Sequence, residues 1–143
     1  MGTIETRWLK DNVQEWIQNK KSGLYDQTSY MVQGILNIFE QVAGVLAPFR
    51  SVELRYSHIV EFGGLEGVMY PTAFHAIFVI LGTDPHPIDP VNKLALWWPG
   101  AWHPVKHVEH PGTAPNDYIE DVIPNSDPGI ESETNKLLDW LET

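Results

Sequence analysis

Prolines constrain this chain more than any other feature of its sequence. Nine of the eleven prolines lie in residues 85–128. A proline fixes the backbone angle φ and has no N–H to donate, so it interrupts helices and is confined to the edges of sheets. We therefore expect extended loops across these residues, with at most a ragged edge strand. The helices and the longest strands are accordingly expected outside this region.

Residues 1–48 have the apolar spacing of two helices. The first is predicted from about Thr3 to Lys20, and its apolar stripe at 3.6-residue spacing consists of Ile4, Trp8, Leu9, Val13, Trp16 and Ile17. The second is predicted from about residue 28 to Leu46, where Pro48 ends a wide apolar face. Gly23, which follows two lysines, indicates that the first helix ends before the second begins. The short link predicts an antiparallel pair.

After residue 50 the spacing of apolar residues changes from the helical period to the two-residue period of strands. Apolar residues alternate with polar ones over residues 51–62, and the glycine-rich segment 63–67 indicates a turn. Residues 73–81 are apolar on both faces, which favours a central strand, and residues 93–98 and 103–110 are candidates for two more. A last short helix is predicted from about Ser132 to Glu142, with Ser132 as its N-cap.

Helices followed by a run of strands predict an α+β fold. We expect two N-terminal helices packed on an antiparallel sheet of about four strands, flat or curved into a roll, with proline-rich loops and a short C-terminal helix. The 143 residues suit a single domain. Its predicted parts are a helical pair at 1–48, a sheet at 49–110, and an acidic loop with the C-terminal helix at 111–143.

Composition excludes several classes of protein. Cysteine is absent, which rules out disulfides, thiolate catalysis and cysteine-ligated zinc. No apolar run approaches the about 18 residues of a membrane span, and no signal segment opens the chain, so we expect a cytoplasmic protein that does not bind membranes. The sequence indicates no cofactor, and the glycine patterns of nucleotide-binding loops and the serine-hydrolase motif are missing.

Charge is distributed unevenly. Residues 1–108 hold ten acids and eight bases, whereas residues 109–143 hold nine acids and one base, Lys136. The acidic end would repel a phosphate backbone, which disfavours nucleic-acid binding, and would attract a basic protein partner. Candidate contact residues are Glu120, Asp121, Glu131 and Glu133. A solvated acidic segment that only keeps the protein in solution is the simpler explanation.

The stretch WWPGAWHPVKHVEH, residues 97–110, is chemically the densest part of the chain. Trp97, Trp98 and Trp102 are candidates for an aromatic binding platform. The alternative places Trp97 and Trp98 on opposite faces of a strand, one in the core and one on the surface. Pro99 and Gly100 then form a turn, after which Trp102 folds back as a hydrophobic plug.

The histidines of the same stretch are candidate metal ligands. His103, His107 and His110 share one face if the segment is helical, whereas in a strand His103 and His107 share a face with Glu109. Pro111 disfavours the helix because it restricts the residue before it. Exposed rings on a polar strand or loop are the simpler alternative.

A second candidate site lies on the predicted sheet. His58 falls on the apolar face of its strand beside Tyr56, and His75 begins the most apolar strand. If residues 51–62 and 73–81 form a hairpin, a register that pairs 58 with 75 puts both rings on one face. They would then be candidate catalytic groups, with Tyr56 as a donor. The simpler alternative is two hydrogen-bonded core histidines.

Two functions are consistent with these patterns. The first is a small, acidic, non-catalytic protein that binds a protein partner, as inhibitors, immunity proteins and phage or mobile-element accessory proteins do; this comparison rests on composition alone. The second is a small enzyme or ligand-binding protein with a pocket between sheet and helices. Self-association as a homodimer is compatible with an apolar strand edge near Trp97.

Overall fold

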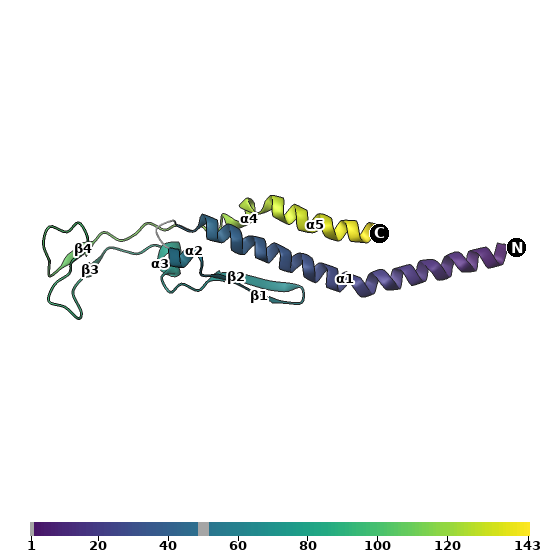
Figure 1. Cartoon of the computed structure of the whole chain (residues 1–143), viewed down its shortest axis with the longest axis horizontal. Helices are drawn as coiled ribbons and strands as arrows, with labels where there is room; N and C mark the ends of the chain where they lie inside the picture. The colour runs from purple at the N-terminus through teal and green to yellow at the C-terminus, as the bar shows by residue number, and fades with distance from the viewer. Residues whose placement is uncertain (1, 49–51) are drawn as a thin grey trace.

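The computed structural model describes the backbone of residues 2–48 and 52–143, and the side chains of residues 12–48 and 52–143. Its elements, in chain order, are α1 Gly2–Leu46, α2 Val52–Arg55, β1 His58–Gly63, β2 Glu66–Pro71, α3 Ala76–Ile80, β3 His86–Ile88, β4 Val108–His110, α4 Val122–Asn125 and α5 Asp127–Glu142. The predicted α+β class is confirmed. The protein has one long N-terminal helix, two small antiparallel sheets and a C-terminal helix (Figure 1).

One continuous helix, α1, replaces the two N-terminal helices predicted from Gly23. A Cβ atom at Gly23 would lie 2.7 Å from Cζ2 of Trp140. Gly23 is therefore a site of close approach by α5, and this tertiary contact outweighs the weak helix propensity of glycine. The stripe residues Ile4, Trp8 and Leu9 lie outside the side chains described. No helix in the described part of the chain is long and apolar enough to cross a membrane.

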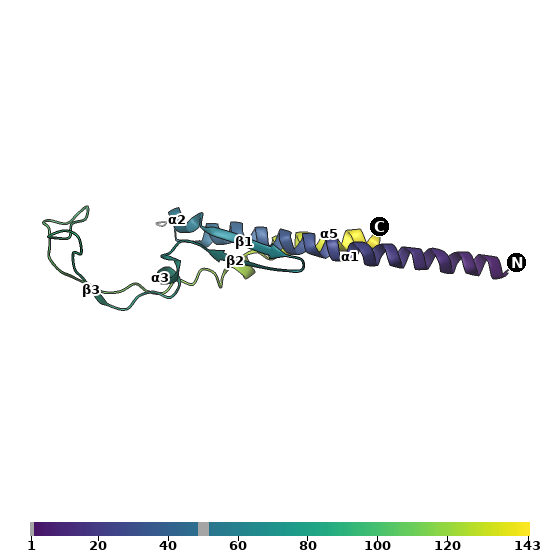
Figure 2. The same ribbon diagram turned by 90° about the horizontal axis from the view of Figure 1, so that it is seen from below.

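Helix α5 lies antiparallel along residues 20–38 of α1 (Figures 1 and 2). Gly129 packs against Ile38 at one end, Gly34 faces Glu133 in the middle, and Lys20 donates to the Trp140 carbonyl at 2.6 Å near the other end. The helix begins at Asp127 rather than at the predicted Ser132. Pro128 is acceptable there because the first turn of a helix needs no internal N–H donors.

The β1–β2 hairpin packs along another side of α1. Its register pairs His58 with Pro71 and Gly63 with Glu66, and Gly64, at φ +67°, starts the two-residue loop. The predicted strand 51–62 is confirmed only from His58 onward. Residues 52–55 form helix α2 instead, and Ser51 lies outside the described residues.

The prediction of a single four-stranded sheet is wrong, because the four strands form two separate sheets. Residues 76–80 of the predicted central strand form helix α3, because an apolar run this short fits a strand and a helix equally well. Strands β3 and β4 form a separate ribbon, and of residues 93–98 only Leu96 makes a bridge, to Val105. The prolines prevent any longer pairing.

The core lies where the C-terminal end of α1 meets α2, α3 and α4. Its buried residues are Ala43, Ala47, Leu54, Ala73, Ala76, Tyr118 and Val122. Residues 84–112, here called the arm, leave the core after α3 and return before α4, and Figures 1 and 2 show the arm extending away from the helices. The core therefore anchors both ends of the arm.

Candidate functional site

The outer end of the arm, residues 89–107, carries the three tryptophans of the 97–110 stretch. We call it the arm tip. Trp97 is 63% exposed, Trp98 is 47% exposed and Trp102 is fully exposed. Paired hydrogen bonds between the backbones of Leu96 and Val105, at 2.7 and 3.0 Å, hold the two sides of the tip together. The tip therefore presents aromatic rings to solvent on a hydrogen-bonded ribbon.

The expectation that one tryptophan lies in the core and that Trp102 plugs the fold is wrong. The arm is a two-stranded ribbon that extends away from the helices (Figure 2), and none of the described helices or other strands lies over it. The predicted turn at Pro99 and Gly100 is present, with Gly100 at φ +96°. Trp97, Trp98 and Ile88 line a small apolar cleft of about 310 Å³ within the arm.

His107 is held between two carboxylates of the arm. Its Nδ1 lies 2.8 Å from Oδ1 of Asp89 and its Nε2 lies 2.7 Å from Oε1 of Glu109. The hydrogen bond to Asp89, and next the one to Glu109, raise the pKa of His107 above its ordinary value. Because each ring nitrogen is hydrogen-bonded to a carboxylate, the His107 imidazole links Asp89 and Glu109 by ion pairs at the base of the arm tip.

The other two histidines of the stretch point to different partners. Nδ1 of His103 lies 3.2 Å from the carbonyl of its neighbour Pro104, whereas His110 stacks on His86 across the ribbon with ring centroids 5.1 Å apart. The segment is not helical, so the spacing of three histidines on one helix face does not arise. Within the described residues, no three His, Asp or Glu side chains are grouped so that they could hold a metal ion.

His58 lies in the core region and is 4% exposed. Its Nε2 is 2.8 Å from the Tyr118 hydroxyl, the two rings meet edge to face, and Nδ1 is 3.4 Å from the Arg55 carbonyl. Burial lowers the pKa of His58 below its ordinary value, and burial together with the charge of Asp117 raises the pKa of Tyr118 to about 12. The pair is therefore neutral near pH 7 and hydrogen-bonded internally.

The structure does not pair His58 with His75. The predicted hairpin between 51–62 and 73–81 is absent, and His58 lies opposite Pro71 in the hairpin that forms instead. His75 lies at the start of α3, where its Nδ1 is 4.0 Å from Oε2 of Glu53. Tyr56 is exposed and shares an open cleft of about 460 Å³ with His58, Glu40 and Arg55.

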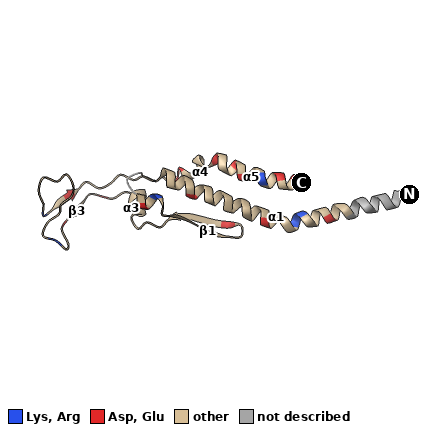
Figure 3. Ribbon diagram, viewed as in Figure 1, with Lys and Arg blue, Asp and Glu red and all other residues tan. Residues whose placement is uncertain are grey.

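The acidic candidates differ in their surroundings. Glu120, Asp121 and Glu131 are exposed, and Figure 3 shows several acidic residues, coloured red, along the ribbon of α5. Glu133 is different: its carboxylate lies against Gly34 of α1 and accepts a hydrogen bond from Lys136. Glu133 therefore belongs to the packing of α5 on α1.

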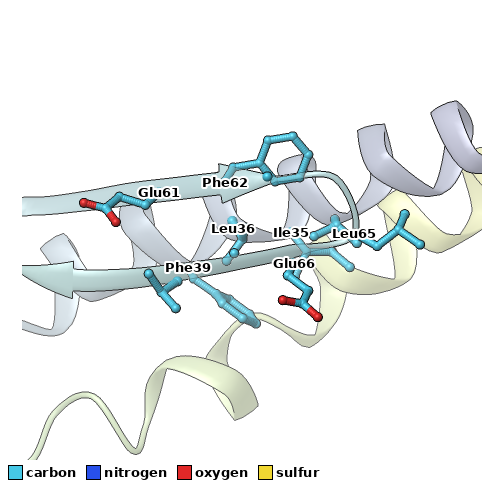
Figure 4. A pocket seen from close by; sticks show the side chains of 11 residues that line it. Ile35, Leu36, Phe39, Glu61, Phe62, Leu65 and Glu66 are labelled. Carbon is cyan, nitrogen blue, oxygen red and sulfur yellow. The ribbon is translucent and has the colours of Figure 1, made fainter.

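Two apolar surfaces were missed by the sequence reasoning. The first lies on α3 and the residues flanking it, where Phe74, Ile77, Phe78 and Leu81 are exposed although a buried strand was expected. The second is an open groove of about 850 Å³ between α1 and the β1–β2 hairpin, here called the hairpin groove (Figure 4). Its apolar lining includes Ile35, Leu36, Phe39, Phe62, Leu65 and Val68. The clue in the sequence was Gly67, a glycine inside a strand, which often marks close approach of another element.

Comparisons with known proteins show no resemblance: no family model, no curated protein and no solved structure matches this chain.

Proposed function

We propose that this protein is a small, acidic, non-catalytic binding protein that acts by contact with a protein partner, and that the arm tip is its main contact surface. One observation carries the proposal: Trp97, Trp98 and Trp102 are exposed together at the outer end of a projecting ribbon. Tryptophan is enriched among the residues that dominate binding energy at interfaces. Large exposed apolar patches on proteins in water mark interaction sites.

The acidic residues support the same function in a second way. Glu120, Asp121 and Glu131 are exposed near the C-terminal part of the chain, which has nine acids and one base over residues 109–143. Such a surface speeds the approach of a basic partner and makes association sensitive to salt. The proposal covers the inhibitor, immunity and phage or mobile-element accessory classes alike, since each acts by binding.

The alternative, an enzyme or ligand-binding protein with one histidine-lined pocket, has less support. His58 uses both ring nitrogens on Tyr118 and the Arg55 carbonyl, and His75 lies beside Glu53. The tryptophans belong to the arm tip, and Figure 1 shows the arm projecting away from the core. The residues proposed for one pocket are therefore divided among three places.

Site-specific photocrosslinking tests the proposal. A photoreactive phenylalanine analogue at position 102 should trap a protein partner in cells that produce this chain naturally. The same analogue at Tyr30, which is 64% exposed on α1, is the matched control and should not trap that partner. The trapped protein is then purified, and its affinity for Trp97→Ser/Trp102→Ser should fall by at least about tenfold. Equal trapping at both positions, or unchanged affinity, contradicts the proposal.

A further inference from the structure

The hairpin groove is an apolar surface with an acidic rim. Phe62, Leu65 and Val68 are exposed along it, and Leu36 and Phe39 of α1 line it from the other side (Figure 4). Glu61 and Glu66 are the two charged residues in its lining. Residues 58–71 contain no lysine or arginine, so no base in the hairpin offsets these two carboxylates. The groove therefore suits an apolar, cationic occupant.

The arm tip has the complementary chemistry. Residues 89–107 contain two lysines, Lys93 and Lys106, and one acid, Asp89, in a chain whose net charge is −10. Val91 and Leu94 are almost fully exposed beside the tryptophans. Two copies of so acidic a chain repel each other in general. The arm tip is a region where that repulsion is absent, and its apolar side chains match the groove.

The arm tip of a chain is not placed to reach its own groove. Figures 1 and 2 show the arm and the β1–β2 hairpin leaving the core in opposite directions along the long axis of the molecule. A contact between the two surfaces therefore joins different copies.

The area of the tip is sufficient for a specific contact. A buried tryptophan contributes about 150–250 Å², so three of them with Val91 and Leu94 approach the roughly 800 Å² per partner of a standard interface. The groove, at about 850 Å³, is much larger than the cleft of about 310 Å³ inside the arm.

We infer that the arm tip of one copy binds in the hairpin groove of a second copy, with Lys93 and Lys106 facing Glu61 and Glu66. This inference rests on the proposed function, because it identifies the arm tip's partner as the same chain. Different patches meet in this contact, so each copy keeps a free tip or groove for the next. Such head-to-tail contacts produce closed rings or open chains.

Charge reversal tests the contact. Sedimentation velocity of the full chain over about 1–100 μM, a range that spans weak to moderate affinities, should show assembly that depends on concentration. The tip variant Lys93→Glu/Lys106→Glu and the groove variant Glu61→Lys/Glu66→Lys should each need at least about tenfold more protein for half-assembly. An equimolar mixture of the two should assemble again, because each tip then meets a groove of opposite charge on the other variant. A monomeric wild type, or a mixture that stays as weak as its parts, overturns the inference.

Crosslinking distinguishes this contact from symmetric ones. The chain has no cysteine, so introduced thiols are the only ones present. Leu94→Cys in the tip and Leu65→Cys in the groove should give bismaleimide-linked dimers when the two variants are mixed, whereas Leu94→Cys mixed with Ser22→Cys, on the exposed side of α1, should not. Crosslinking of Leu94→Cys alone shows tip-to-tip contact, and that of Leu65→Cys alone shows groove-to-groove contact. Either result as the main product overturns the inference.

The two proposals fail in different ways. If position 102 traps a different protein while the purified chain stays monomeric, the binding function stands and the head-to-tail contact is overturned. If position 102 traps copies of this chain, linked at groove residues, both are supported. If it traps nothing and the purified chain is monomeric, both are overturned.

Discussion

The core and the arm tip use the same kinds of side chain in opposite surroundings. Leu54 in the core is 0% exposed, whereas Leu94 at the arm tip is 93% exposed. The Tyr118 hydroxyl of the core is hydrogen-bonded to Nε2 of His58 in a buried pair, whereas Trp102 is fully exposed to solvent. Residue type alone therefore does not separate the part that folds the chain from the part available for binding.

The difference shows where the folding energy comes from. Burial of apolar surface stabilises a fold by roughly 25 cal/mol per Å², and the core gains this while the arm tip does not. The tip keeps its shape through backbone hydrogen bonds at Leu96 and Val105 and through the ion pairs of His107. Its apolar surface stays available to a partner, which would gain the same energy on binding.

The largest contrast is expected from leucine truncation in the two regions. Leu54→Ala should lower the free energy of unfolding by about 2–5 kcal/mol, because it removes buried methyl groups and leaves a cavity. Leu94→Ala, the matched control, should change it by no more than about 0.5 kcal/mol. Urea denaturation followed by circular dichroism measures both. Similar losses in the two variants would mean that the arm tip is packed against the fold in solution.

The helices show how far periodicity predicts structure. The 3.6-residue spacing correctly identified helical residues in both halves of α1 and in α5. It failed at Gly23, where a local rule predicted a helix end, because the ring of Trp140 packs on the glycine from 117 residues further along the chain. A contact that distant leaves no trace in the neighbouring residues.

The sheet and the candidate sites show the same limit. The alternation around His58 predicted its burial correctly, but the partner is Tyr118, which lies near the end of the proline-rich residues 85–128, and not His75. The tryptophans were recognised as a candidate binding surface, yet their exposure depends on the arm projecting beyond every other element (Figure 1). Strand pairing and exposure both depend on which segments meet, and a single sequence does not state this.

Glycine substitutions compare the two ends of the arm. A Cβ at Gly112, where φ is +83°, would collide with the Thr83 carbonyl and lie 2.9 Å from the Asp84 carbonyl carbon. At Gly100, where φ is +96°, it would meet no atom within 4 Å. Gly100→Ala should therefore lower the local stability of the arm only by the backbone strain, about 1–2 kcal/mol. Gly112→Ala should lower it by more, because the close contacts add to that strain. Amide hydrogen exchange at Thr83 and Thr113, which bond each other at the base of the arm, should speed up mainly in Gly112→Ala. Equal exchange in both variants would contradict the close contact at Gly112.

The two partnered histidines should respond to pH with opposite sign. Burial lowers the pKa of His58, so the unfolded chain takes up its proton first, and stability is lost as pH falls below about 6.5. The carboxylates of Asp89 and Glu109 raise the pKa of His107, so its contribution is present below about 6.5 and is lost as pH rises through the raised value. Ring-proton NMR titration should place the two midpoints on opposite sides of 6.5.

Denaturation at several pH values extends this test to stability. One proton changes the unfolding free energy by at most about 1.4 kcal/mol per pH unit. His58→Gln should reduce the loss of stability between pH 6.5 and 5.5, whereas His107→Gln should leave that loss in place. If both histidines titrate at 6.5 and neither variant changes the slope, the burial of one and the ion pairs of the other are contradicted.

The smallest effect on folding is expected where the effect on binding is largest. Trp102 is fully exposed, so Trp102→Ser should change the free energy of unfolding by no more than about 0.5 kcal/mol. Trp140→Ser is the matched control: its ring packs on Gly23 and lies under the Lys20 ammonium, 4.4 Å from the ring centroid, so its loss should destabilise the α1–α5 pair. Sedimentation should show the reverse order, with self-assembly weakened most by Trp102→Ser. A Trp102→Ser protein that melts early yet assembles normally would make the tryptophan a part of the fold, and the contrast between core and arm tip would no longer hold.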